Sequence, residues 1–260
     1  MATEREPIIR VRNLEAGYGE NAILENVSFD IREGERFIIL GPSGCGKSTL
    51  LRHMVGLNPT RRGSITIRGM EVTGEDETMF QKIVREIGFL FQNSALLGSL
   101  TVAENVALPI LEYTDLPQSC VEAVVQIKLA QVNLSGFGNY LPSELSGGMK
   151  KRAALARAMA MGPGILFFDE PAAGLDPITL AELDSLILYL NTNLGTTMVI
   201  VTHELSSIFT LGQRVIMLDK EAKGIIAEGD PAELRDHSPH PLVRRFFNRE
   251  PRDSGNGRGA

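Results

Sequence analysis

Hydrophobic and polar positions alternate along several short stretches of the chain, with the period of half-buried strands. The alternation involves Ile9 and Val11, then Val27, Phe29 and Ile31, then Ile65 and Ile67. Three other runs are continuously apolar, at 37–40, 165–168 and 198–201. Such runs are typical of central strands in a parallel sheet that is covered on both faces. A polar cluster follows each run, and ligands bind at the carboxyl ends of parallel strands. The pattern therefore predicts an α/β fold with a ligand site at that edge of the sheet.

The middle of the chain changes to helical periodicity. Thr101 and Glu104 have the spacing of a capping box, and apolar residues then recur on one helical side until Pro109. Further helical patterns cover 119–132 and 150–161. We therefore expect a helical subdomain inserted into an α/β core.

The chain is expected to form one domain, 1–260, with three parts. The predicted segments are 1–92 with 163–236 for the α/β core and its β subdomain, 93–162 for the helical subdomain, and 237–260 for a C-terminal extension. Within the core, 215–218 and 225–228 resemble a strand pair. The extension contains Leu242, Val243, Phe246 and Phe247, followed by a polar tail. These apolar residues are expected either to pack on their own domain before a disordered tail, or to dock on another copy or a small regulatory partner.

A glycine-rich segment directly follows the apolar run 37–40. It has the phosphate-binding pattern G-x-x-x-x-G-K-[ST]. Glycines let backbone N–H groups converge on a phosphate, and a helix that begins near Lys47 adds the positive end of its dipole. We expect Lys47 to bind the β- and γ-phosphates of ATP and Ser48 to ligate Mg²⁺. The predicted ATP-binding residues of this loop are Gly41, Pro42, Ser43, Gly44, Cys45, Gly46, Lys47, Ser48 and Thr49.

The apolar run 165–168 ends in two carboxylates, Asp169 and Glu170. Asp169 is expected to hold Mg²⁺ through water. Glu170, one residue further along, is expected to point elsewhere by strand alternation. One carboxylate can then serve the metal while Glu170 polarises the attacking water.

A second helix start that suits an anion lies at Leu145-Ser146-Gly147-Gly148. Ser146 is a natural N-cap, and the glycines expose backbone donors at the positive end of the helix. This turn lies about a hundred residues from the first, on the predicted helical subdomain. We expect Ser146, Gly147 and Gly148 to complete the γ-phosphate site of another copy, so that ATP is held between two subunits.

Composition narrows the setting. The net charge of −6 argues against a nucleic-acid-binding surface, which normally has a basic excess. No apolar run approaches the 18 or so residues that span a bilayer, and the first residues lack a secretory signal pattern. Cys45 and Cys120 do not make a disulfide framework. These features predict a cytosolic chain.

Together, the phosphate loop, Leu145-Ser146-Gly147-Gly148 and Asp169-Glu170-Pro171 resemble the ATPases of ATP-binding-cassette (ABC) transporters over nearly the whole chain. The resemblance implies a P-loop core with a mostly parallel sheet, an antiparallel β subdomain and a helical subdomain. It also implies ATP and Mg²⁺ as cofactors, and a homodimer that drives separate transmembrane permease subunits. The chain would then lie on the cytoplasmic side of the inner membrane.

The resemblance assigns further roles. Tyr18 would stack on adenine, and Gln92 would sense Mg²⁺ and the lytic water beside the membrane partner. Asp176 would communicate across the dimer, and His203 would contact the γ-phosphate. With Lys47 and Glu170, these assignments make Gln92 and His203 the expected catalytic residues.

The stretches 145–158, 169–171 and 174–179 are similar to one subgroup, the ATPases of Mce-type and maintenance-of-lipid-asymmetry (Mla) transporters. This similarity implies a phospholipid or another hydrophobic substrate, and an Mce-domain substrate-binding protein and a small regulatory subunit as partners. Met149 stands where many cassettes have glutamine, so it offers no side-chain amide to the ribose. An ABC ATPase of another importer or exporter is the alternative. A soluble assembly or repair factor is another, although the chain lacks the long insertion and the second cassette typical of DNA-repair and translation relatives.

Overall fold

The computed structural model describes residues 7–19, 21–72 and 76–250. Its strands are β1 Pro7–Tyr18, β2 Asn21–Arg32, β3 Arg36–Leu40, β4 Arg62–Ile67, β5 Met70–Glu71, β6 Ile87–Leu90, β7 Ile165–Asp169, β8 Thr197–Val201, β9 Arg214–Asp219 and β10 Gly224–Gly229. Its helices are α1 Lys47–Met54, α2 Glu77–Glu86, α3 Val102–Tyr113, α4 Gln118–Gln131, α5 Gly147–Ala158, α6 Pro177–Leu194, α7 Leu205–Leu211, α8 Pro231–His237 and α9 Pro241–Asn248, with a 3₁₀ turn at Pro142–Glu144.

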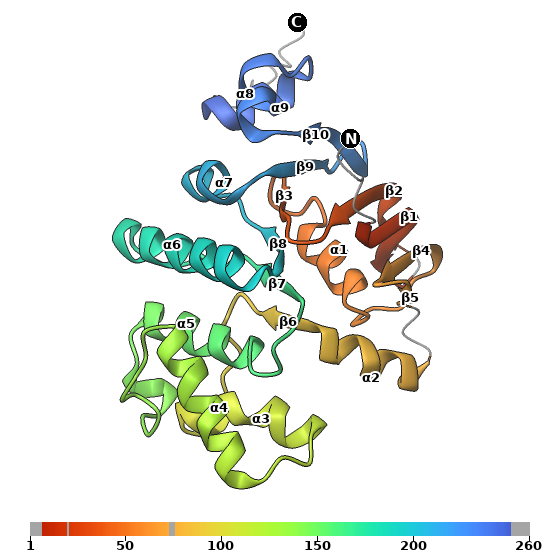
Figure 1. Cartoon of the computed structure of the whole chain (residues 1–260). Coiled ribbons are helices and arrows are strands. Elements are labelled where there is room, and N and C mark those ends of the chain that lie inside the picture. Colours follow the sequence, from red (N-terminus) through yellow and green to blue (C-terminus); the bar gives the residue numbers. More distant parts are fainter. Residues whose placement is uncertain (1–6, 20, 73–75, 251–260) are drawn as a thin grey trace, which may run out of the picture.

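The described strands form two sheets (Figure 1). One is antiparallel, in the order β2-β1-β4-β5, and the other has the order β10-β9-β3-β8-β7-β6. In the second sheet all neighbours are parallel except β9 and β10. The three continuously apolar runs are its strands β3, β8 and β7, which lie side by side and are fully buried apart from Arg36. The predicted α/β fold with parallel and antiparallel β parts is confirmed.

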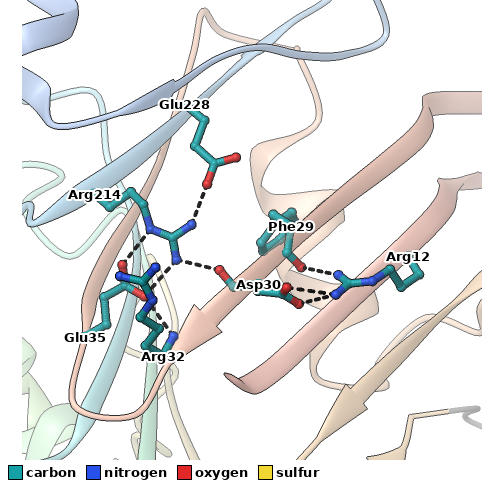
Figure 2. Close-up of polar contacts among 7 residues, drawn as sticks. All are labelled: Arg12, Phe29, Asp30, Arg32, Glu35, Arg214 and Glu228. Atoms are coloured by element: carbon teal, nitrogen blue, oxygen red, sulfur yellow. Dashed lines mark hydrogen bonds and ion pairs between the residues drawn. The ribbon is translucent and has the colours of Figure 1, made fainter. Parts of the chain in front are cut away.

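Arg214 on β9 connects the two sheets (Figure 2). Its guanidinium donates to both carboxylate oxygens of Glu35, at 2.7 and 2.9 Å, and to the backbone carbonyl of Asp30 on β2, at 2.6 Å. It also pairs with Glu228 on β10 and lies over the ring of Phe37, 4.9 Å from the ring centroid. The hydrogen bonds to Glu35 are the main cause that raises the pKa of Arg214, so the group stays charged.

Helices α3, α4 and α5 pack together below the parallel sheet in the view of Figure 1. Helix α3 does not end at Pro109, where the apolar pattern stopped, but continues to Tyr113. Ile110, just beyond the proline, is buried in the main hydrophobic cluster, so tertiary packing outweighs the lost backbone donor. Helix α5 begins at Gly147, directly after the Ser146 cap, and ends before the predicted limit of 161.

The C-terminal extension forms α9. Val243 and Phe247 are buried in the same hydrophobic cluster as the parallel sheet, and Leu242 and Phe246 are partly buried. Two of the four apolar residues therefore pack on their own domain. The tail expected to be disordered begins at Asn248, which is the last residue of α9, and its residues 251–260 lie outside the described part of the chain. Within the described part of the chain, no helix has both the length and the apolar character that crossing a bilayer requires.

We predict that Arg214→Met lowers the free energy of unfolding by about 3 kcal/mol, because it leaves the Glu35 carboxylate buried without its cation. The measurement is urea denaturation. Lys223→Met is the matched control, since the Lys223–Glu25 pair is half-exposed and should contribute less than about 1 kcal/mol. Equal losses in the two variants would contradict the role of Arg214 as the connection between sheets.

Candidate functional site

The carboxyl ends of β3, β8 and β7 meet at one edge of the parallel sheet. Val201 near the end of β8 is opposite Ile39 on β3 and Asp169 on β7. The phosphate loop, the Asp169–Glu170 pair and His203 therefore leave the sheet at the same edge. The sheet register alone brings together segments that lie more than a hundred residues apart.

Loop 41–49 fits a phosphate through its backbone. Gly41, Gly44 and Gly46 all have positive φ angles, of 147°, 78° and 101°. A Cβ atom at Gly41 would lie 2.4 Å from the Leu218 carbonyl oxygen, so only glycine fits there. At Gly44 a Cβ would meet nothing within 4 Å, which leaves that backbone open to a ligand.

Lys47, the first residue of α1, bends back over the loop. Its ammonium donates to the carbonyls of Gly41, at 2.9 Å, and Pro42, at 3.2 Å, and the side chain is buried. These carbonyls hold the charge within the loop, where a phosphate oxygen would take their place. The loop is therefore prearranged for a polyphosphate.

The Ser48 hydroxyl donates to Oδ1 of Asp169, at 2.7 Å. Asp169 is buried at the end of β7, and Ser48 lies on the first turn of α1. A hydroxyl and a carboxylate are the oxygen ligands that Mg²⁺ prefers, and the two already lie in contact. This donor set fits the magnesium ion that the sequence implies.

Glu170 is buried and has a left-handed backbone, with φ of 48°. Its N–H donates to the Val201 carbonyl of β8, at 2.9 Å. We expected strand alternation to direct the Glu170 side chain. The alternation does not apply, because the chain leaves the extended conformation at this residue. The turn therefore sets the direction of the Glu170 carboxylate.

His203 lies beside that carboxylate. Its Nδ1 is 2.8 Å from Oε2 of Glu170, although Oε2 is buried and receives no well-aligned hydrogen bond. The His203 ring is about half-exposed, and its Nε2 faces Glu204 at 3.6 Å. Glu170 and His203 thus form a pair next to Asp169.

Tyr18 lies at the end of β1, with its ring half-exposed. Hydrogen bonding to Thr49 is the main cause that lowers the pKa of Tyr18, and Arg52 donates to its hydroxyl at 3.2 Å. The buried His53 holds the adjoining Gly17, whose N–H donates to its Nε2 at 3.2 Å. Burial lowers the pKa of His53, which favours the neutral ring that can accept this bond. Helix α1 thus holds both the phosphate loop and the end of β1 at Gly17 and Tyr18, which we call the Tyr18 turn.

The Ser146–Gly148 turn lies at the start of α5, where the Ser146 hydroxyl accepts from the Met149 N–H at 3.3 Å. A Cβ at Gly148 would come within 2.5 Å of the Thr179 methyl group on α6. Ser146 and Gly147 are exposed. Asp176 caps α6 and accepts from Thr179 and Ile178, and these bonds lower its pKa. The two segments adjoin each other on the face of α5 and α6.

Gln92 follows the end of β6, and its side chain is exposed. Its backbone carbonyl accepts a hydrogen bond from Lys151 of α5. Sequence reasoning did not single out Lys151 or His53. A signal existed for Lys151, because it lies one helical turn from Ala154 and Leu155 on a face that is otherwise apolar.

The sequence profile of the ABC transporter family matches residues 24–173, more than half of the chain. The chain belongs to the ABC transporter ATPase family. This ABC ATPase binds and hydrolyses ATP, as expected from its phosphate loop.

Two curated relatives cover most of the chain. The intermembrane phospholipid transport system ATP-binding protein MlaF of Escherichia coli is 37% identical over 93% of this ABC ATPase and 88% of MlaF. The probable ribonucleotide transport ATP-binding protein Mkl of Mycobacterium leprae is 39% identical over 92% of this chain and 68% of Mkl.

Solved cassettes share the fold. A dimeric post-hydrolysis structure of the ATP-binding cassette MJ0796, bound to ADP and Pi, has a TM-score of 0.77 and 33% identity, covering 85% of this chain and 98% of that one. CbiO1 of Clostridium perfringens, part of the CbiONQ transporter complex, has a TM-score of 0.80 and 28% identity, covering 93% and 94%.

Proposed function

We propose that this ABC ATPase drives the movement of phospholipid, or another hydrophobic substrate, through separate transmembrane subunits. The observation that carries the proposal is the 37% identity with MlaF across 93% of this chain, because MlaF is named for phospholipid transport between membranes. The name of Mkl points instead to ribonucleotide transport, so the cargo is the part of the proposal that needs its own test.

Two copies of the chain would enclose ATP between them. The Ser146–Gly148 turn offers backbone N–H groups at a helix start, and its neighbours within the chain are Leu175 and Thr179 instead of the phosphate loop. A second copy supplies the phosphate loop that this turn lacks. The dimeric state of MJ0796 supports this arrangement.

Within each site, Lys47 would exchange its loop carbonyls for the β- and γ-phosphate oxygens. Ser48 and Asp169 would hold Mg²⁺, Asp169 through water. The ion would supply positive charge to the phosphates. Tyr18, anchored through its hydroxyl to α1, would present its exposed ring to the adenine.

Glu170 would orient and polarise the attacking water, because it is a buried carboxylate next to Asp169, which accepts from Ser48 of the phosphate loop. His203 would contact the γ-phosphate from its position next to Glu170. Gln92 would approach Mg²⁺ and the water from the end of β6, and Asp176 would communicate between the copies. Catalysis then consists of positioning and electrostatic stabilisation, with little covalent chemistry for the protein.

The partners in this proposal are permease subunits, an Mce-domain substrate-binding protein and a small regulatory subunit, with the ATPase peripheral on the cytoplasmic side of the inner membrane. Leu242 and Phe246 of α9 are only partly buried, and we extend the proposal to their docking on the second copy or the regulator. Val243 and Phe247 are already used in the core.

We predict that Glu170→Gln binds ATP with unchanged affinity but hydrolyses it at least about 100-fold more slowly, because the amide cannot take up a proton from water. The measurements are nucleotide titration and phosphate release. ATP should then trap a dimer of this variant in size-exclusion chromatography. Hydrolysis at the native rate would remove Glu170 from the catalytic role.

The cargo and partners are tested by purifying the native complex from detergent-solubilised membranes and identifying its subunits and lipids by mass spectrometry. The proposal predicts a multi-span permease together with bound phospholipid. Recovery with soluble proteins alone would overturn the transport role. Recovery with a permease that carries ribonucleotides would overturn the lipid cargo and leave the ATPase assignment in place.

A further inference from the structure

The segment between β6 and α3 is held by two cations of helix α5. Lys151 donates through Nζ to the carbonyl of Gln92. Arg157 donates to the carbonyls of Ser94, at 2.8 Å, and Ala95, at 2.6 Å. Three of four carbonyls between 92 and 95 thus receive a charged donor from α5, the helix that begins at Ser146–Gly148.

The backbone of this segment is unusual where the cations bind. Ser94 and Ala95 both have left-handed φ angles, of 61° and 48°. For residues other than glycine that conformation costs about 1 kcal/mol each, so surrounding contacts must hold it in place. The charged hydrogen bonds from α5 are such contacts.

The rest of the segment is fixed to α3. The buried side chain of Asn105 accepts from the Leu97 N–H, at 2.8 Å, and donates to the carbonyls of Leu97, Leu100 and Thr101, at 2.9 to 3.1 Å. From Gln92 to Thr101 the chain is therefore tied to the helical subdomain. The parallel sheet holds it only as far as Leu90, which pairs with Phe168 of β7.

Lys151 itself lies between the two parts of the molecule. It is buried on α5, and its charge interacts with Asp169 and Glu170 at the end of β7. Burial is the main cause that lowers its pKa, and the two carboxylates oppose that shift. A buried ammonium is costly unless it is paired, and here it donates to the Gln92 carbonyl while its charge interacts favourably with the two carboxylates.

We propose that Lys151 is a positioning residue that fixes the Gln92 backbone to helix α5. The hydrogen bond from Lys151 fixes where the Gln92 backbone lies, and so limits where its side chain can reach relative to Asp169 and Glu170. The inference rests on the proposed role of Gln92 at the metal and the water.

The test is steady-state ATPase kinetics of the full-length chain carrying Lys151→Met. We expect kcat to fall by about tenfold to 100-fold, the loss that a misplacement of about 1 Å produces, while KM for ATP changes less than about twofold. Lys151→Arg should restore most of kcat, because a guanidinium also donates to the Gln92 carbonyl. Lys128→Met, at a half-buried lysine of α4, is the matched control and should leave both parameters unchanged.

A double-mutant cycle with Gln92→Ala separates this inference from the proposed function. If Lys151 acts through Gln92, the double variant is no slower than Gln92→Ala alone. A native kcat in Gln92→Ala would overturn the role of Gln92 and the positioning role with it. A slow Gln92→Ala beside a native Lys151→Met, or losses that multiply, would overturn the positioning role alone. Should Lys151→Met fail to fold, Arg157→Met carries the same cycle, with the same expected non-additivity.

Discussion

The parallel register of β3, β8 and β7 is the constraint on which the site depends. These strands are buried on both faces of the sheet. A one-residue shift of any strand would move each of its side chains to the opposite face, where the packing partners differ. With the register fixed, Val201 is level with Asp169, and the phosphate loop begins beside them. This register explains the contact between Ser48 and Asp169. Asp169 ends β7, and the loop that leads to Ser48 begins at the end of β3, at the same edge of the sheet. Chemistry at the strand ends is thus a consequence of packing within the sheet.

Two connections extend this arrangement to the rest of the molecule. Arg214 ties the antiparallel sheet to β9, and helix α1, through Arg52 and His53, ties the Tyr18 turn to the phosphate loop. The 92–101 segment is held differently, by Lys151 and Asn105 of the helical subdomain. The adenine side of the site is therefore tied to the core, whereas the Gln92 backbone is tied to the helices. This division suits a motor in which one part must move relative to a fixed nucleotide.

Much of the fold and of the candidate site could be predicted from the sequence. The features that could not be predicted depend on contacts between residues far apart in the chain. Buried strands, the glycine loop and the Ser146 cap carry their own signals, because period, glycine and capping chemistry act locally. The direction of Glu170 could not be predicted, since it depends on a left-handed turn held by the Val201 carbonyl across the sheet. The continuation of α3 past Pro109 depends on burial of Ile110 by distant residues. Lys151 was visible as a lysine on an apolar face, but its partner, a carbonyl 59 residues earlier, was not.

The central claim is that the phosphate loop of one copy and the Ser146–Gly148 turn of the other make one site. The most direct measurement mixes a Lys47→Ala chain with a Gly147→Asp chain, each inactive alone, and follows single-turnover ATP hydrolysis. A mixed dimer has one site with both defects and one intact site. When equal amounts of the two chains pair at random, about half of the dimers are mixed, and each mixed dimer has one intact site of two. The account therefore predicts recovery of about a quarter of the native activity. If the two motifs serve the same site within one chain, mixing restores nothing, and that result would contradict the account.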